Sequence, residues 1–506
     1  MLPISCFSKY GYVNVLLKIQ ARFKSEEHWA KLKRKVTSSN KALNHFDDFY
    51  ASVFRNEWKS IREALLSPSK YVAVINNYGD SEETMDYFKM QGAHCLKTLM
   101  TVQEQFTNEY YPKKRKEKST DSDKSVETLM KKFQVDEISK LYPQIDNISD
   151  RMDADSESKI DEKSEMNTQI KSLDQSMAEA QIDLSRIVNP STGLVAEALY
   201  QYLPATKLKG MDDWLPESLH YSFYTEGKDF PLIIEPETDF SFPEHLKVCT
   251  YEMGSEMSTF DEPRRGQTGV YNHYPMDCGS VLAVMALCLS PGDRVLDLCA
   301  APGGKSLVAL QTLLPDVIVC NDISISRRNR MQHIFKNYLI DFEESNKWRE
   351  RVILKRVDGR IYMDDMGFDK VLVDAPCTTD RVSVNEDKNN IFRPDRIRER
   401  LRIPEMQAQL LANALQLVRV GGAVVYSTCS LSPIQNDGVV HLALKKAFES
   451  RSIVAVVRDM SIPMSSLSST LRLCKGEAKP KYGQLVLPSL EANFGPTYIA
   501  RLVRVR

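Results

Sequence analysis

Five short apolar runs rich in β-branched residues alternate with helical segments in the C-terminal half of the chain, and this alternation limits the possible folds more than any other feature. The runs lie at 294–300, 317–322, 352–358, 369–377 and 423–430. Segments with apolar residues at helical spacing separate them, at 306–314, 326–339 and 404–418. We expect Gly421 and Gly422 to end the last of these helices, as glycines commonly do. Regular alternation of strands and helices predicts an α/β fold, in which helices cover both faces of a parallel sheet.

Most of the expected strands end in an aspartate or a cysteine. In a sheet of parallel strands, ligands bind at the edge where the carboxyl ends of the strands meet. This rule places six side chains at one edge: Asp297, Asp322, Asp358, Asp374, Cys377 and Cys429. We therefore expect the functional site along that edge.

The segment DLCAAPGGKS, at 297–306, connects the first strand to the following helix. Gly303 and Gly304 allow the backbone to turn tightly and to approach a ligand closely, and the helix behind them offers free N–H groups. The segment is not a phosphate-binding loop, because Cys299 stands where that motif requires its first glycine, and the two adjacent glycines also break the dinucleotide fingerprint. A nucleoside without a phosphate chain fits better. The alternative is a strand-to-helix turn that binds nothing.

Two further positions would complete a nucleoside site. Asp322 can accept hydrogen bonds from both ribose hydroxyls, although an aspartate at this place is equally typical of a helix N-cap. Asp358 and Gly359 suit the edge of an adenine, although Asp-Gly is also a strong turn signal. Their register with the glycine loop favours the ligand interpretation.

Two thiols end neighbouring strands at the same edge, Cys377 in DAPC and Cys429 in STCS. A single cysteine is more often buried apolar filler, but a pair beside a ligand site indicates chemistry. An ionised thiol is a potent nucleophile that can attack C6 of a pyrimidine, and the adduct makes C5 able to accept a methyl group. The ten cysteines include no C-x-x-C pair and no cluster with zinc spacing, so we expect no metal. These residues alone leave open which thiol attacks.

The motifs DLCAAPGGKS, DAPCTTDR and YSTCSLSPIQND resemble the signature motifs of the Sun-domain RNA cytosine-5 methyltransferases, which use S-adenosylmethionine. The resemblance extends over roughly 225–506 and implies a class I, Rossmann-like methyltransferase domain. The segments KYVAVINNYG, NNIFRP, YGQLVLP and ANFGPTY are similar to the family member that acts on mitochondrial small-subunit ribosomal RNA. The long segment at about 100–220 departs from the family pattern.

The resemblance also implies roles for individual residues. The implied cofactor-binding set is Gly303, Gly304 and Lys305 at the methionine end, Asp322 and Arg327 at the ribose, Asp358 and Gly359 at the adenine, and Asp374 between the cofactor and the target base. The implied catalytic set is Cys429, the nucleophile on C6, Cys377, which assists product release, and Asp374. DNA cytosine methyltransferases use the cysteine of the P-C motif instead, and we follow the RNA family here.

Positive charge near the expected site predicts an RNA-binding surface. Arginines are concentrated at 326–330 and 392–402, whereas the whole chain has 67 Lys and Arg against 68 Asp and Glu. Arginine can contact phosphate and stack on splayed bases, and the alternative is a solvated helix face with internal ion pairs. The target cytosine must leave its stack, which favours unpaired RNA.

The chain divides into four expected regions. They are a mitochondrial transit peptide at 1–25, a helical extension at 26–112, a charged and disordered insert at 113–190, and the methyltransferase domain with its RNA-binding elements at 191–506. Residues 1–25 contain basic residues and serines but no Asp or Glu, which predicts import into the mitochondrial matrix. The longest apolar run, at 281–289, is too short to span a membrane.

These observations lead us to expect methyl transfer from S-adenosylmethionine to C5 of cytosine in mitochondrial small-subunit ribosomal RNA, through a covalent adduct of Cys429, in support of ribosome assembly. The resemblance also implies transfer RNA as a further candidate substrate and an mTERF-type helical-repeat protein as a candidate partner. The alternative is a non-catalytic ribosome-assembly factor that keeps the fold and binds RNA. Degenerate cofactor motifs would favour that alternative, but here every cofactor position is populated.

Overall fold

The computed structural model describes residues 37–110, 230–238, 240–255 and 259–506. The expected transit peptide and the expected insert lie outside the described residues. Ten strands of the described chain form one sheet, and its central part runs in the order β10-β9-β6-β7-β8. These strands are β6 (Arg294–Asp297), β7 (Val317–Asn321), β8 (Val352–Lys355), β9 (Phe368–Asp374) and β10 (Val418–Thr428). They pair in parallel, which confirms the five predicted strands and the α/β fold.

Antiparallel strands extend the sheet beyond β10. Strand β14 (Thr497–Arg504) pairs with β10 and is followed outward by β13 (Gln484–Leu487) and β12 (Arg472–Leu473). Strand β11 (Ala455–Asp459) also pairs with β14, and β3 (Ile233–Pro236) pairs in parallel with β11.

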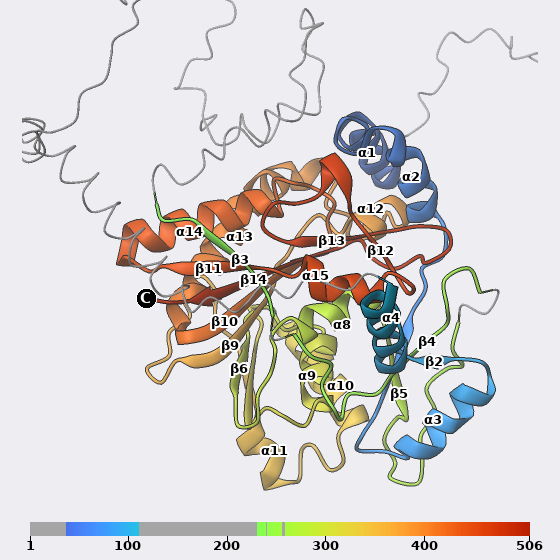
Figure 1. Cartoon of the computed structure of the whole chain (residues 1–506). Helices are drawn as coiled ribbons and strands as arrows, with labels where there is room; N and C mark the ends of the chain where they lie inside the picture. The colour runs from blue at the N-terminus through green and yellow to red at the C-terminus, as the bar shows by residue number, and fades with distance from the viewer. Residues whose placement is uncertain (1–36, 111–229, 239, 256–258) are drawn as a thin grey trace, which may run out of the picture. The chain divides into compact units, whose positions relative to one another are not determined.

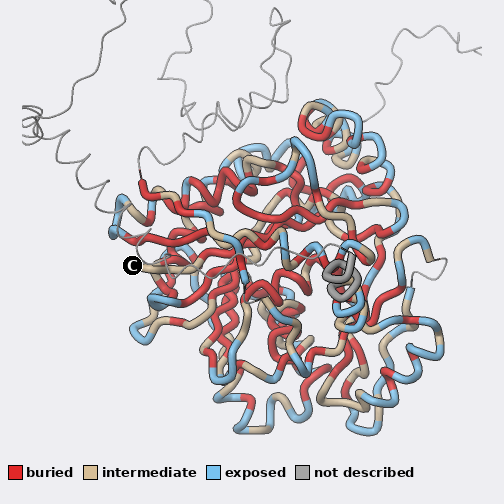
Figure 2. Tube along the Cα trace, viewed as in Figure 1, coloured by how far each residue is buried: buried red, intermediate tan, exposed pale blue. Residues whose placement is uncertain are grey.

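Helices cover both faces of the sheet (Figure 1). One face packs on α13 (Ile397–Leu417) and α14 (Asp437–Arg451), and the other on α8 (Cys278–Met285), α9 (Gly304–Gln311) and α10 (Ile325–Tyr338). Successive strand residues point to opposite faces, so Val424 of β10 joins the first core and Val425 joins the second. Most residues of β6, β7, β9 and β10 are buried (Figure 2), as parallel strands between two helical layers must be, whereas β8 is only partly buried. The remaining helical elements are α11 (Asn346–Arg351), α12 (Asp380–Asn385), α15 (Ser461–Met464), η1 (Arg55–Glu57), η6 (Pro394–Arg396), η7 (Ser465–Leu467) and η8 (Gly476–Ala478).

Gly421 and Gly422 lie in a strand of the sheet, so the prediction that they end a helix is wrong. Helix α13 ends at Leu417, and both glycines lie in β10. Gly421 has a φ of +84°, at a register irregularity between Val418 and Ala423. A Cβ atom on Gly422 would lie 2.6 Å from a backbone oxygen of β9, so a larger residue would push the two strands apart.

The described part of the N-terminal region, 37–110, is mostly helical but also contains two strands. Its helices are α1 (Ser38–Phe54), α2 (Trp58–Leu66), α3 (Ser81–Met90) and α4 (Leu96–Tyr110). Strands β1 (Val72–Ile75) and β2 (His94–Cys95) form a separate small sheet with β4 (Val248–Thr250) and β5 (His273–Met276). No helix in the described ranges is long and apolar enough to cross a membrane.

Helices α1 and α2 bury the aromatic residues that the sequence places at helical spacing. Phe46 is 1% exposed, and its ring lies 5.2 Å from the ring of Phe392 in an edge-to-face arrangement. The ring of Phe46 also lies 5.0 Å from that of Tyr50. This packing joins the N-terminal helices to the core around α13.

Truncation of this aromatic cluster should destabilise the whole domain. We expect Phe46→Ala to lower the free energy of unfolding by about 3–5 kcal/mol, because it removes a fully buried ring and leaves a cavity. Met90→Ala is the control, since Met90 is 81% exposed, and its cost should stay below about 0.5 kcal/mol. Chemical denaturation measures both, and a cost below about 1 kcal/mol for Phe46→Ala would contradict this packing.

Candidate active site

The carboxyl edge of the sheet contains an open pocket at the ends of β7 and β8. Its cavity volume is about 100 Å³. Four residues predicted to bind the cofactor line it: Asp322, Arg327, Asp358 and Gly359. The apolar part of the wall comes from Leu298, Ile323, Met406 and Leu410. The sequence analysis missed these apolar residues, and the side chains of Met406 and Leu410 reach the pocket only because α13 packs on the sheet.

Asp322 is nearly fully buried at the end of β7. Its Oδ1 accepts a hydrogen bond from the Ser324 backbone N–H at 2.9 Å, and its Oδ2 lies 3.3 Å from Nη2 of Arg327. The N-cap of α10 is Ser324, whose hydroxyl accepts from the Arg327 N–H. Another residue therefore caps the helix, and Asp322 lines the pocket. This arrangement favours the ligand interpretation of Asp322 over the N-cap interpretation.

Asp358 and Gly359 form a turn and also line the pocket. The Asp358 carbonyl accepts from the Ile361 N–H at 3.1 Å, so the Asp-Gly turn signal is real. Hydrogen bonds from Arg360 lower the pKa of Asp358 and keep its carboxylate ionised. A Cβ atom on Gly359 would lie 2.7 Å from Leu410 Cδ2, so only glycine leaves the pocket wall undisturbed. Arg360 itself is a pocket residue that the sequence analysis did not single out.

The glycine loop lies beside a partly buried pair of opposite charges, Lys305 and Asp374. Lys305 Nζ contacts Asp374 Oδ2 at 2.7 Å, and Ser427 donates its hydroxyl to Asp374 Oδ1 at 2.9 Å. Burial disfavours the ammonium form of Lys305, but the adjacent Asp374 carboxylate outweighs burial and raises the Lys305 pKa. Gly303, in the same loop, has a φ of +110°, a conformation that favours glycine.

Asp297 ends β6 just before this loop and is almost completely buried. Its Oδ2 accepts a hydrogen bond from Ser306 Oγ at 2.6 Å, whereas its Oδ1 has no hydrogen-bond partner among the described residues. Burial raises the pKa of Asp297 from 3.8 to about 7. A buried acceptor without a partner is costly, and a ligand that supplies a donor would satisfy it.

The two predicted thiols, Cys377 and Cys429, lie in contact with each other. The Sγ atoms of Cys377 and Cys429 are 3.1 Å apart, with Cys429 exposed and Cys377 half-buried. The contact with Cys377 raises the pKa of Cys429 well above its ordinary value, and the Asp374 carboxylate acts in the same direction. Lys305 opposes this shift with its positive charge. Two sulfur atoms at this distance can share one proton, and both lie beside the Asp374 carboxylate.

Comparison with known proteins gives a consistent picture. Residues 284–479 match the family model described as 16S rRNA methyltransferase RsmB/F. The chain is 33% identical over 481 residues to the 5-cytosine rRNA methyltransferase nsun-4 of Caenorhabditis elegans, which covers 94% of each protein. It is 41% identical over 263 residues to the 5-cytosine rRNA methyltransferase NSUN4 of Bos taurus, covering 52% of this chain and 67% of the relative. It is 35% identical over 243 residues to the mitochondrial tRNA (cytosine(34)-C(5))-methyltransferase of Danio rerio, covering 46% and 61%.

The raised pKa of Asp297 predicts a pH dependence of stability. The folded state binds this proton more tightly than the unfolded state, so the contribution of Asp297 to stability falls as pH rises from about 4 through about 7. Between pH 5 and pH 7, the free energy of unfolding of wild type should fall by on the order of 1–2 kcal/mol relative to that of Asp297→Asn, which mimics the protonated acid. Denaturation curves of the ligand-free protein measure the difference. The exposed Asp365→Asn should follow wild type, and a parallel course for Asp297→Asn would contradict the shift.

Proposed function

The chain belongs to the RsmB/F family of RNA cytosine-5 methyltransferases, and from this premise we propose that it methylates cytosine in mitochondrial small-subunit ribosomal RNA with S-adenosylmethionine as methyl donor. The observation that carries the proposal is the pair of Sγ atoms 3.1 Å apart beside the Lys305–Asp374 pair. The pocket lined by Asp322, Arg327 and Asp358 lies at the same edge of the sheet. We infer ribosomal RNA as the substrate because relatives over most of this chain are named as rRNA methyltransferases.

S-adenosylmethionine, when bound, supplies an electrophilic methyl group on a sulfonium. The residues present fit such a ligand, because the pocket offers the polar side chains of Asp322, Arg327 and Asp358 between apolar walls. We assign its methionine end to Gly303, Gly304 and Lys305. Asp322 with Arg327 would bind the ribose. The adenine would lie between Asp358, Gly359 and the apolar wall.

In the proposed reaction, the sulfur of Cys429 forms a bond to C6 of the target cytosine after its thiol proton leaves. That proton passes to solvent, because the Cys429 thiol is exposed, so Cys377, whose sulfur lies 3.1 Å away, stays available to act as a base later. C5 then carries the electron pair and accepts the methyl group. Cys377 removes the proton from C5, the bond between Cys429 and C6 breaks, and the methylated base is released. Asp374, held by Lys305 and Ser427, borders both the thiols and the glycine loop.

We propose that the RNA contacts the outer face of α10. A hollow there is lined by Pro302, Ser326, Asn329, Arg330, His333 and Ile334. Within the described residues, the side chains of Asn329 and Arg330 have no hydrogen-bond or ion-pair partner, so their donors are available to a ligand. In the second basic segment, by contrast, Arg393 pairs with Asp395 and Arg396 pairs with Glu399. The α10 face therefore offers uncompensated positive charge, as do Arg398 and Arg402 of the second segment, which form no ion pair within the described residues.

The remaining assignments extend the proposal to the whole chain. We propose residues 1–25 as the matrix-targeting segment, 113–190 as an insert and 191–506 as the methyltransferase domain. One relative is named as mitochondrial, which supports this compartment. Transfer RNA as a second substrate and an mTERF-type protein as a partner rest on the family resemblance. Bisulfite sequencing of mitochondrial RNA from cells with and without the protein would locate the modified cytosine. If every methylated cytosine persists in cells without the protein, a non-catalytic assembly factor is favoured.

The two thiols should give opposite mutant behaviour. Cys429→Ala should abolish methyl transfer, since no sulfur remains to attack C6, and should form no covalent complex. Cys377→Ala should accumulate a covalent protein–RNA complex, because the C5 proton is not removed. Denaturing gels with labelled RNA measure both, and the half-buried Cys95→Ala is the control with wild-type activity. A free, unlinked product from Cys377→Ala would overturn the assignment of the two roles.

Charge reversal on α10 should weaken RNA binding. We expect Arg330→Glu to raise the dissociation constant for a substrate RNA about tenfold and to reduce the slope of its logarithm against the logarithm of salt by about one. Arg451→Glu, an exposed change at the end of α14, should leave both values near wild type. Fluorescence anisotropy over a salt series measures the effect. Equal losses from both variants would contradict a specific role for α10.

A further inference from the structure

A buried carboxylate outside the cofactor pocket joins the two loops that carry the thiols. Asp380, the first residue of α12, is 0% exposed. Its Oδ1 accepts a hydrogen bond from Thr378 Oγ1 at 2.5 Å, and its Oδ2 accepts one from the Leu431 backbone N–H at 2.7 Å. The hydroxyl of Ser430 lies 3.2 Å from both oxygens.

These contacts hold the chain immediately after each thiol. Thr378 follows Cys377, and Ser430 follows Cys429. The backbone N–H of Asp380 donates to the Cys429 carbonyl at 3.2 Å, and the hydroxyls of Thr378 and Ser430 are 3.0 Å apart. A shift of Asp380 would therefore displace both loops.

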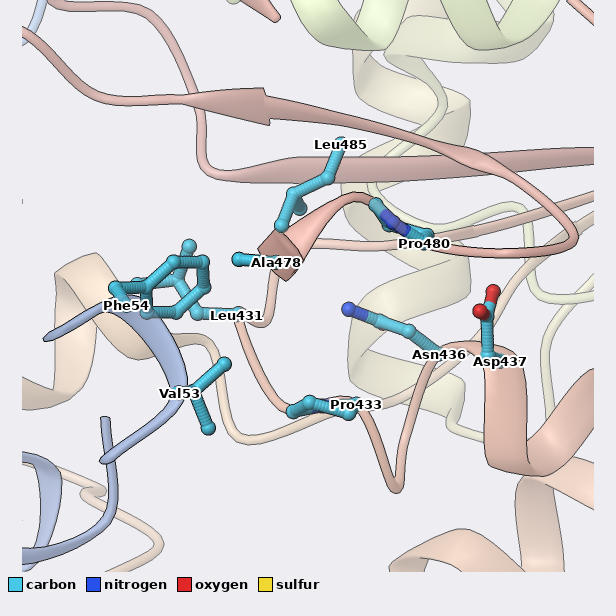
Figure 3. A pocket seen from close by; sticks show the side chains of 9 residues that line it. All are labelled: Val53, Phe54, Leu431, Pro433, Asn436, Asp437, Ala478, Pro480 and Leu485. Atoms are coloured by element: carbon cyan, nitrogen blue, oxygen red, sulfur yellow. The ribbon is translucent and has the colours of Figure 1, made fainter. Parts of the chain in front are cut away.

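A further donor to this carboxylate comes from the N-terminal helix. Tyr50 of α1 donates its hydroxyl to Asp380 Oδ2 at 2.7 Å, across more than three hundred residues of sequence. Val53 and Phe54, one turn further along α1, line a small cavity with Leu431 (Figure 3). Helix α1 thus packs directly against the loop that follows Cys429.

The energetic cost of burial explains why this arrangement is rigid. Burial raises the pKa of Asp380, and the hydrogen bonds from Thr378, Tyr50, Leu431 and Ser430 oppose that shift. Burial also raises the pKa of Tyr50 well above its ordinary value, which keeps the hydroxyl protonated and able to donate. A displaced loop would leave a buried polar group unpaired, so the network favours one geometry.

We propose that Asp380 and Tyr50 are positioning residues that hold the Sγ atoms of Cys377 and Cys429 in contact, so that helix α1 forms part of the active site. The proposal rests on the proposed function only in taking these thiols as the reacting groups. Asp380 and Tyr50 act on them through Thr378 and Ser430.

Two variants test the proposal, each with a matched control. Tyr50→Phe removes one hydroxyl and keeps the ring, and its control is Tyr482→Phe, a buried tyrosine whose hydroxyl contacts His441 Nδ1 at 2.9 Å. Asp380→Asn replaces an acceptor oxygen with a donor. Its control is Asp437→Asn, a buried carboxylate that accepts from Tyr498 at 2.6 Å and lies outside the thiol loops.

The first measurement uses the full chain without RNA or cofactor. Iodoacetamide alkylation of each thiol is followed against pH by mass spectrometry of tryptic peptides, which separate Cys377 from Cys429. The groups around Cys429 are Cys377, Asp374 and Lys305, and the contact with Cys377 is the largest cause of its raised pKa. If the loops separate, the midpoint for Cys429 should fall by about one pH unit in Asp380→Asn, with about tenfold faster alkylation at neutral pH. Tyr50→Phe should give about a threefold increase.

The controls should keep the wild-type profile, and thermal melting confirms that each variant is folded. Unchanged profiles in folded Tyr50→Phe and Asp380→Asn would overturn the proposal, and so would equal shifts in the control variants. If Asp380→Asn does not fold, the alkylation profile of Tyr50→Phe alone tests the proposal. Methylation kinetics give a second measurement, in which kcat falls about tenfold or more for Asp380→Asn while KM for RNA stays within about twofold. If the wild-type protein methylates no RNA, the proposed function is wrong. The alkylation result alone then tests whether Asp380 and Tyr50 position the thiols.

Discussion

The parallel pairing of β9 with β10 is the constraint on which the site depends. Its register places Asp374, the last residue of β9, directly beside Ser427, the penultimate residue of β10. The thiols follow a few residues later, and a slip of one residue would turn these side chains to the opposite face of the sheet. Gly422 of β10 belongs to the same constraint, because it allows the two strands to approach where a side chain would clash.

Buried polar groups then make this edge specific. Lys305 and Ser427 occupy both oxygens of Asp374, and a larger set of donors surrounds Asp380. Each group is costly to bury alone and is tolerated because a partner from another element satisfies it. The result connects β9, β10, α9, α12 and α1 through a few short contacts. Asp297 Oδ1 is an exception, because it has no hydrogen-bond partner within the described residues.

Much of this arrangement could be predicted, and the failures have physical causes. The strands were predictable because apolar runs buried on both faces leave a local signal, and the strand ends located the candidate residues. Gly421 and Gly422 were misassigned, because a glycine that ends a helix and a glycine at a strand irregularity look alike without the neighbouring strand. Strand β1 in the N-terminal region was missed, since its partners β4 and β5 lie far along the chain.

The sequence by itself determined the alternation of strands and helices, the edge at which the site lies, and the family to which the chain belongs, because each depends on local residue patterns or short motifs. Only the tertiary structure decided which partners complete those motifs. It brought Tyr50 to Asp380, set the two sulfur atoms in contact, and placed the apolar face of α13 on the pocket. Such contacts join segments far apart in sequence, and packing alone decides which side chain meets a buried charge.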